Sequence, residues 1–370
     1  MEDQELDKEL DEMLEQMDAS APQKKKKKKK GALVALIIFL VLLLLMAAGI
    51  GLYVNYLLDR LGDYDPSLNV TVSPDKIEDI IDKDPGRVPV DPNEQLPGIE
   101  DLTPPPGGPG IPKEKDVVNI LIVGQDSNNA AVRTRSDTMI LVSVHTKAKQ
   151  VTLTSFMRDA YVKIPGYASN KLNHAFEFGG LKLLNDTLKE NFGVEIDGNV
   201  IIDFSSFQQI IDILGGVDIN LTKKEASYLV NGGKHDVHAG WNRLTGRQAL
   251  DYARLREIDS DYQRTNRQRT VILSIMDRYK TLPVDEMLDL LDDILPMIVT
   301  DMDKAQILEY ALKCAPVAAT ASYGTQQIPA NGTFKQGYVK VREGLKNWFQ
   351  YDIDFNKNRD ILEKIMDGKR

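Results

Sequence analysis

Residues 117–126 read VVNILIVGQD, and this run of apolar, mainly β-branched residues that stops at a glycine predicts a buried β-strand. Two further runs rich in β-branched residues follow it, at residues 138–145 and 151–156. Short strands are also predicted at residues 200–203 and 217–221. Apolar residues recur at helical spacing in six later segments, at residues 180–192, 204–214, 246–256, 265–279, 287–298 and 304–311. Strands that alternate with helices at this spacing predict an α/β, or mixed α+β, fold with a central mixed sheet covered by helices.

The N-terminal part of the chain differs sharply from this globular region. Residues 31–54 contain no charged residue, and the seven lysines at positions 24–30 precede them directly. About 20 apolar residues span a bilayer core as a helix, and a basic flank stays in the cytoplasm. We therefore predict a cytoplasmic tail over residues 1–30, one transmembrane helix over residues 31–54 in the cell membrane, and an extracytoplasmic remainder. The alternative, a cleaved signal peptide, usually has a shorter apolar region.

The segment between this helix and the first strand is rich in proline and glycine. Breaker clusters occur at residues 63–66, 84–86 and 104–110, with little periodicity between them. We predict an extracytoplasmic Pro-rich stalk over residues 55–115 that holds one large catalytic domain, residues 116–370, near the lipid bilayer.

Composition excludes several classes of function. The formal net charge of −9 argues against nucleic acid as a partner, because such proteins carry a basic face. The single cysteine, Cys314, removes any disulfide framework and any thiolate zinc site. Neither a P-loop nor a dinucleotide-binding fingerprint is present. An acidic chain with a few clustered arginines suits the local binding of a small anionic group.

Two aspartates bracket the connection between the first two predicted strands. Asp126 follows the first strand and Asp137 opens the second. If the strands are neighbours, both carboxylates lie at the same rim of the sheet. Mg²⁺ prefers such carboxylates together with phosphate oxygens, and two turn aspartates without a metal are the alternative.

Arginines mark two further places. Arg158 and Asp159 end the third strand, where a guanidinium group can bind phosphate oxygens or simply pair with the aspartate. Arg254 and Arg256 are two residues apart, so they cannot share one face of a regular helix, and the chain is expected to unwind there. On the helix predicted over residues 265–279, three- and four-residue steps back from its apolar stripe reach Gln268 and Arg264. These two polar side chains must therefore pair with each other or line a cavity.

The order of these motifs resembles the LytR-CpsA-Psr family of bacterial envelope proteins. The matching blocks run from residue 119 to residue 278: Gly124-Gln125-Asp126, Arg135-Ser136-Asp137-Thr138, Ser155-Phe156-Met157-Arg158-Asp159, Lys171-Leu172-Asn173-His174-Ala175, Leu214-Gly215-Gly216-Val217, and Leu244 to Arg256 with Asp261, Arg264, Arg267 and Gln268. One departure from the family pattern is that Ser127, not arginine, follows Asp126.

The resemblance implies a Mg²⁺-dependent transferase, with Mn²⁺ as a possible substitute, that moves a glycopolymer such as teichoic acid or capsule polysaccharide from a polyprenyl pyrophosphate carrier to peptidoglycan. It implies that Asp126 and Asp137 hold the metal. The pyrophosphate-binding side chains that it implies are Arg135, Arg158, Arg254, Arg256, Arg264 and Gln268. Asp137 and Asp159 are alternative general bases beside Arg158. A polyprenyl-pyrophosphate phosphatase and a non-catalytic prenyl-pyrophosphate-binding regulator remain the alternative functions.

Overall fold

The computed structural model describes residues 51–62, 66–73, 76–82, 84, 86–91, 93–103, 105–125, 134–318 and 320–369. It divides the chain into two units, residues 1–56 and 57–370. In the first unit the described residues, 51–56, are helical, and the rings of Tyr53 and Tyr56 stack. None of the helices in the described part of the chain combines the length and apolarity that a bilayer crossing needs. The predicted cytoplasmic tail and most of the predicted transmembrane helix lie outside the described residues.

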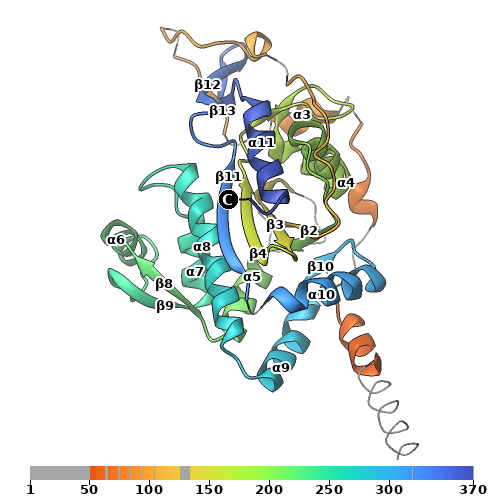
Figure 1. Cartoon of the computed structure of the whole chain (residues 1–370). Coiled ribbons are helices and arrows are strands. Elements are labelled where there is room, and N and C mark those ends of the chain that lie inside the picture. Colours follow the sequence, from red (N-terminus) through yellow and green to blue (C-terminus); the bar gives the residue numbers. More distant parts are fainter. Residues whose placement is uncertain are drawn as a thin grey trace, which may run out of the picture. The chain divides into compact units, whose positions relative to one another are not determined.

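A six-stranded mixed sheet forms the centre of the second unit (Figure 1), in the order β10-β7-β2-β3-β4-β11. Strands β2 and β7 are parallel, as are β4 and β11, whereas the other pairs are antiparallel. The bounds are β2 (Val117–Gln125), β3 (Ser136–His145), β4 (Gln150–Phe156), β7 (Gly198–Ile202), β10 (Val299–Thr300) and β11 (Ser322–Ile328). The structure thus confirms the predicted mixed sheet.

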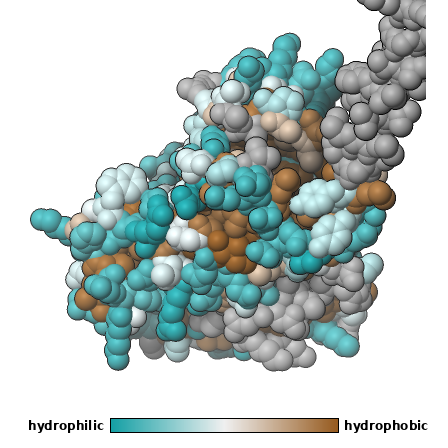
Figure 2. All heavy atoms as spheres, turned by 90° about the horizontal axis from the view of Figure 1, so that it is seen from below, coloured by the Kyte–Doolittle hydropathy of each residue, from teal (hydrophilic) through white to brown (hydrophobic). Residues whose placement is uncertain are grey.

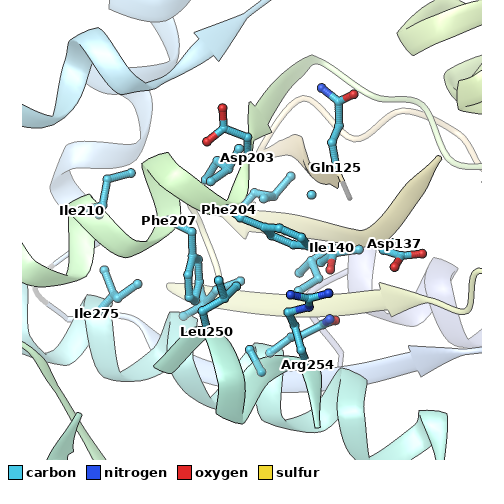
Figure 3. A pocket seen from close by; sticks show the side chains of 17 residues that line it. Gln125, Asp137, Ile140, Asp203, Phe204, Phe207, Ile210, Leu250, Arg254 and Ile275 are labelled. Atoms are coloured by element: carbon cyan, nitrogen blue, oxygen red, sulfur yellow. The ribbon is translucent and has the colours of Figure 1, made fainter. Parts of the chain in front are cut away.

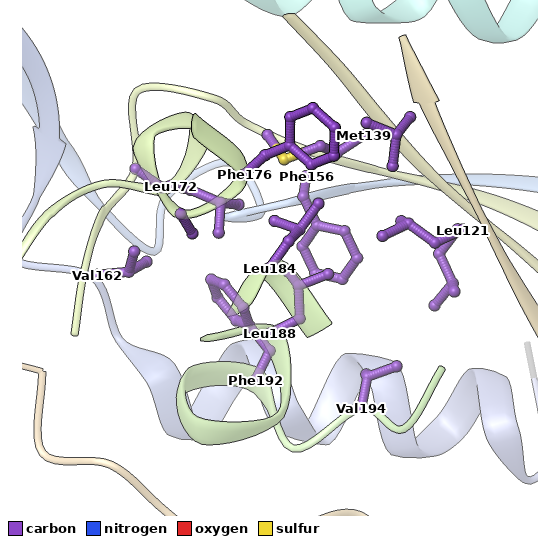
Figure 4. Close-up of a cluster of buried hydrophobic side chains, with 14 of the residues drawn as sticks. Leu121, Met139, Phe156, Val162, Leu172, Phe176, Leu184, Leu188, Phe192 and Val194 are labelled. Carbon is purple, nitrogen blue, oxygen red and sulfur yellow. The ribbon is translucent and has the colours of Figure 1, made fainter. Parts of the chain in front are cut away.

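One face of this sheet packs against helices α4 (Leu172–Phe192) and α11 (Phe355–Met366). Alternate residues of β2, such as Leu121 and Val123, are fully buried there. Figure 4 shows Phe156 of β4 and Phe192 of α4 in this core, where their ring centroids lie 5.4 Å apart. Because successive side chains of a strand point to opposite faces, the residues between them must meet a different set of helices.

Helices α5, α7 and α8 cover that second face (Figure 1). They belong to a smaller hydrophobic cluster around Ile211, Leu229 and Val271, together with a two-stranded sheet. The bounds are α5 (Phe204–Ile213), β8 (Val217–Leu221), α6 (Lys223–Asn231), β9 (Gly240–Leu244), α7 (Gly246–Arg254) and α8 (Asp261–Lys280). Between helix α8 and strand β11 the chain also forms α9 (Val284–Ile294), the 3-10 helix η4 (Leu295–Met297) and α10 (Lys304–Ala318).

Several described residues of the predicted stalk, residues 55–115, pack within the second unit. Ile77 lies in the main core, and Leu102 lies in a third hydrophobic cluster with Phe349. Apolar residues between the proline and glycine clusters therefore bury this segment on the domain. The elements involved are η1 (Pro66–Asn69), α3 (Ile77–Asp82), β1 (Val88–Pro89) and η3 (Ile99–Asp101), with β1 joining a sheet in the order β1-β13-β12. The other strands nearby are β12 (Lys335–Arg342), β13 (Leu345–Tyr351), β5 (Tyr161–Val162) and β6 (Asn170–Lys171).

Candidate functional site

An apolar pocket lies between the second face of the sheet and helices α5, α7 and α8 (Figure 3). Its cavity volume is about 120 Å³, and it opens to solvent. The sheet contributes Ile122, Ile140 and Ile202, which alternate with residues of the main core. The helices contribute Phe204, Phe207, Ile210, Leu250, Ala253, Ile272 and Ile275. On the face of the molecule shown in Figure 2, apolar side chains also gather among hydrophilic ones. The sheet and these helices thus leave an apolar cavity beside the core.

A polar pocket adjoins the apolar one. The two pockets share the lining residues Asp137, Thr138, Phe204, Arg254 and Gln268. The other residues that line the polar pocket are Asp84, Gly86, Arg135, Arg158, Asp159, Lys171, Asn173, Arg256, Glu257 and Arg264. A ligand with an apolar tail and an anionic head therefore finds both of its environments in one continuous site.

Strand ends place the residues of the sheet at this site. Gln125, the last residue of β2, lies opposite Ser136 at the start of β3, so Asp137 stands at the rim where β2 ends. Arg158 follows the end of β4 by two residues. Its Nη1 donates to Asp137 Oδ1 at 2.7 Å. Asp126, the other predicted metal ligand, lies outside the described residues.

The chain leaves helix α7 at Arg254, as the spacing of the two arginines predicts. Leu255 is extended, with φ −61° and ψ 124°, and it turns Arg256 toward the sheet. Arg256 Nη2 lies 3.5 Å from Asp137 Oδ2. The Arg254 guanidinium lies 4.4 Å from the centroid of the Phe204 ring. The break in the helix therefore brings both arginines to the polar pocket from one short segment.

Helix α8 carries one continuous face from the apolar pocket to the polar one. Ile275 and Ile272 line the apolar pocket, Gln268 lines both pockets, and Arg264 lines the polar pocket. Arg264 is 2% exposed, and its Nε lies 2.7 Å from Asp261 Oδ1. Gln268 and Arg264 thus continue the apolar stripe of α8, and of the two predicted alternatives, mutual pairing or lining a cavity, both side chains line the pockets.

Electrostatics at the polar pocket are dominated by guanidinium groups. Burial alone raises the pKa of Asp137, but Arg158, followed by Arg264 and Arg256, outweighs burial and holds the pKa of Asp137 below its usual range. Burial lowers the pKa of Arg256, and the neighbouring charges of Arg264 and Arg158 lower it further. Guanidinium groups this close to one another form a concentration of positive charge that favours an anion with several oxygens.

A buried network of ion pairs and hydrogen bonds contacts the side chains of the polar pocket. Lys171 Nζ lies 3.0 Å from Asp159 Oδ1 and donates to Asn347 Oδ1 at 2.8 Å. Asp84 accepts hydrogen bonds from Arg135 Nη1 and Asn347 Nδ2, each at 2.7 Å. Burial raises the pKa of Asp84, but Lys171 and several hydrogen bonds outweigh it and lower the pKa.

No role was predicted for Asp84, Lys171 or Asn347. Asp84 stood in a proline and glycine cluster, which predicts only a turn. Lys171 belonged to a matching block, and this was a signal of its place at the site. Nothing in the sequence links Asn347 to residues more than 170 positions away.

Arg267 belongs to the same motif but not to the pocket. It is 4% exposed, and its Nε donates to Glu225 Oε1 at 2.7 Å. It also pairs with Asp259 and donates to the backbone oxygen of Leu255 at 3.0 Å. Arg267 thus ties helix α8 to helix α6 and to the segment that carries Arg256.

Replacing Arg267 with alanine is expected to lower the free energy of unfolding by about 3–5 kcal/mol, because a buried carboxylate loses its partner. Arg243→Ala is the matched control, since Arg243 pairs with Asp218 on the surface, where both side chains are half exposed. The denaturant midpoint measures both changes. Equal midpoints for the two variants would contradict a structural role for Arg267.

Of the two predicted metal ligands, Asp126 and Asp137, the described residues include only Asp137. In the part of the chain that the structure describes, no three histidine, cysteine, aspartate or glutamate side chains are grouped to hold a metal ion. Asp137 is the predicted metal ligand that the structure places at the pocket, and its side chain is 20% exposed. One or two carboxylates together with phosphate oxygens are the usual ligands of Mg²⁺, so the donor set at Asp137 is compatible with that ion.

Comparisons with known proteins give one consistent result. A family model described as the LytR_cpsA_psr family matches residues 83–351. The chain is 38% identical over 208 residues to a polyisoprenyl-teichoic acid–peptidoglycan teichoic acid transferase, TagU of Oceanobacillus iheyensis, covering 53% of this chain and 63% of that protein. It is 30% identical over 251 residues to the transferase TagT of Bacillus subtilis, covering 65% and 78%. The chain thus spans slightly less than two thirds of the TagU protein.

Solved structures agree with the fold. The structure of TagT bound to LIIa-WTA superposes with a TM-score of 0.55 at 25% identity, and the match covers 75% of this chain and 97% of that one. A crystal structure of TagT from B. subtilis superposes with a TM-score of 0.53 at 25% identity, covering 68% and 90%.

Proposed function

Because the chain belongs to the LytR-CpsA-Psr family, we propose that it is a transferase that moves a glycopolymer from a polyprenyl pyrophosphate carrier to peptidoglycan. A teichoic acid is the polymer favoured by the names of the relatives TagU and TagT. The single observation that carries the proposal is the continuity of the apolar pocket with the arginine-lined pocket. A prenyl pyrophosphate has the same two parts in the same order.

The apolar pocket suits the prenyl tail. The surface that its lining exposes is almost entirely apolar, so isoprene units leave water without burying many polar groups. Burial of apolar surface contributes roughly 25 cal/mol per Å². A long tail therefore supplies most of the binding free energy, and the headgroup contacts determine orientation.

The polar pocket suits the pyrophosphate. Planar guanidinium groups bind phosphate oxygens in pairs, and Arg158, Arg256 and Arg264 converge on Asp137 from three separate elements. Arg135 and Arg254 line the same pocket, and Gln268 adds an uncharged amide at the junction. We assign these six side chains to the pyrophosphate.

The chemical step joins a sugar hydroxyl of peptidoglycan to the phosphorus that bears the glycan. A new phosphorus–oxygen bond forms, the bond to the bridging oxygen breaks, and polyprenyl phosphate leaves with the electron pair. Asp159 lies beside Lys171 and Arg158, so we assign it to holding Arg158 in place. Asp137 and Asp159 are two of the carboxylates of the polar pocket, and one of them accepts the hydroxyl proton. Such reactions depend mainly on position and charge neutralisation, which arginines supply.

Mg²⁺ belongs to this proposal as a cofactor. Asp137 would hold it together with Asp126. When bound, the ion would add positive charge next to the phosphate oxygens. The proposal also includes the predicted membrane anchor at residues 31–54, because a tethered enzyme meets its membrane-bound substrate at a high effective concentration.

A single assay separates this function from its alternatives. The full chain in detergent is incubated with Mg²⁺, a polyprenyl pyrophosphate disaccharide and a peptidoglycan fragment, and the products are identified by mass. We expect a sugar–phosphate–sugar linkage that disappears when the metal is chelated. Free glycan phosphate without the linkage would instead identify a phosphatase, and unchanged bound lipid would identify a regulator.

A further inference from the structure

Helix α10 carries apolar side chains on its outer face as well as on its inner one. The inner face, with Ile307, Tyr310 and Val317, is buried or half-buried. On the opposite face, Leu312 is 67% exposed and Leu308 is 39% exposed. A surface helix usually carries polar residues on that side. The exposed apolar residues there recur at helical spacing, and we call them the outer stripe: Ala305, Leu308, Leu312, Ala315 and Pro316.

No charged residue of α10 interrupts the outer stripe. The charged residues of this helix are Lys304, Glu309 and Lys313. At 3.6 residues per turn, all three lie to the sides of the stripe or behind it. The stripe therefore forms a continuous apolar strip about 17 Å long on the helix surface. Exposed apolar surface of this kind marks a place that a partner or a membrane covers.

The chain itself keeps α10 close to the predicted transmembrane helix, residues 31–54. The first charged residues after Lys30 are Asp59 and Arg60. Asp59 forms an ion pair with Lys304, the first residue of α10. Five residues of chain span at most about 18 Å. If residues 31–54 cross the bilayer, Asp59 and its partner on α10 therefore lie near the membrane surface.

Two further contacts hold the chain beyond Asp59 on the same edge of the domain. Arg60 Nη2 donates to the backbone oxygen of Asp292 on α9 at 3.2 Å, and Arg60 Nε lies 3.5 Å from the carboxylate of Asp292. The backbone N–H of Gly62 donates to the oxygen of Ile298 at 3.0 Å. The segment that follows the predicted anchor is therefore bound to the edge formed by α9 and α10, and it does not act as a free spacer.

From the outer stripe and these contacts we propose that α10 docks on the bilayer surface, with Leu308 and Leu312 among the lipids. The inference rests on the membrane anchor in the proposed function and extends it. Interfacial helices bury their apolar face about 5–10 Å into the boundary between headgroups and acyl chains. The tether raises the effective concentration of lipid at this edge, so a short stripe is sufficient. Lipid is favoured over a second copy of the chain because the tether keeps the bilayer beside α10 in every anchored molecule.

Docking through α10 would also position the apolar pocket. Helix α9 contacts helix α5, and α5 lines the apolar pocket through Phe207 and Ile210. The docked edge and the pocket are thus connected through α9. Exposure of a prenyl tail to water costs roughly 25 cal/mol per Å². A domain that docks by this edge would hold the pocket near the bilayer that contains the carrier and so limit that exposure.

Quenching of tryptophan fluorescence by lipids with brominated acyl chains tests the contact, with the full chain in phosphatidylcholine nanodiscs. Leu312→Trp places an indole on the outer stripe, and the native Trp241 and Trp348 give the background signal. The matched control is Val230→Trp on α6, because Val230 is also an exposed apolar residue, at 42%. Leu308→Trp repeats the test if circular dichroism shows that Leu312→Trp does not fold.

We expect brominated lipid to remove roughly half of the fluorescence that Leu312→Trp adds, because its indole would lie at the depth of the upper acyl chains. The fluorescence that Val230→Trp adds should not change. Equal quenching of the two variants would overturn docking through α10. An unquenched Leu312→Trp signal that shifts to the red when each nanodisc holds one chain instead of two would identify a second copy as the cover, and it would also overturn the proposal.

The test is separate from catalysis and from anchoring. Quenching is measured without substrate, so an absence of transfer by the native chain would refute the proposed transferase and leave the docking result intact. Release of the native chain from vesicles by alkaline carbonate would refute the anchor and, with it, the docking. A chain that resists carbonate but shows no quenching of Leu312→Trp would refute the docking alone.

Discussion

Replacement of Arg158 by lysine is expected to lower the rate of transfer by about 10²–10³-fold. Arg158 lies between Asp137 and Asp159, with its Nη1 2.7 Å from the first and its Nε 3.4 Å from the second. Lysine keeps the positive charge that both carboxylates need, so the fold is retained. Lysine lacks the planar fork that binds two phosphate oxygens at once. The variant therefore stabilises the transition state less than the native chain does.

The matched control is Arg243→Lys. Like Arg158, Arg243 uses two of its nitrogens to contact carboxylate oxygens, but both belong to one aspartate. Arg243 Nε and Nη2 donate to Asp218 at 2.9 and 2.7 Å, and neither residue lines the pockets. Steady-state rates at saturating donor should fall only in the Arg158 variant, with similar melting temperatures for both. Native rates in Arg158→Lys would remove Arg158 from the reaction.

The second large effect is expected in the apolar pocket. Figure 3 places Ile275 well away from Arg254 and Asp137, at the other end of the drawn group. Ile275→Trp would fill that end and prevent burial of roughly 100 Å² of prenyl surface, equivalent to about 2–3 kcal/mol. Binding of octaprenyl pyrophosphate should weaken on the order of 100-fold. Binding of a two-isoprene pyrophosphate should not change, because its tail does not reach that far.

Ile275→Leu, which preserves the volume of the side chain, is the control and should bind both lipids as the native chain does. Fluorescence or calorimetric titration with the two chain lengths provides the measurement. Equal weakening for the short and the long lipid would show that the tail does not extend along α8 toward Ile275.

Periodicity and residue spacing predicted the positions of several pocket residues, because the geometry of a single helix brings those residues to the pocket. A helical period of 3.6 residues alone puts Gln268 and Arg264 in line with Ile272, and the structure has all three on the pockets. The two-residue spacing of Arg254 and Arg256 led us to expect the chain to unwind there, and helix α7 does end before the extended residue Leu255.

Contacts between distant residues could not be predicted in this way. Asp84 lies in a segment without periodicity, and its place at the pocket depends on Asn347, 263 residues further along the chain. Strand β11 has the polar sequence SYGTQQI, and it becomes a strand by parallel pairing with β4. Helix α6 was missed although Thr222 and Glu225 form a capping box, which was a readable signal.

A crystal structure of the chain with octaprenyl pyrophosphate would show whether the adjoining apolar and polar pockets bind the lipid and its headgroup together. We expect both phosphorus atoms within reach of the guanidinium groups of Arg158, Arg256 and Arg264, with the tail between the sheet and helices α5, α7 and α8. A pyrophosphate bound elsewhere on the domain, or a tail outside the apolar pocket, would contradict it.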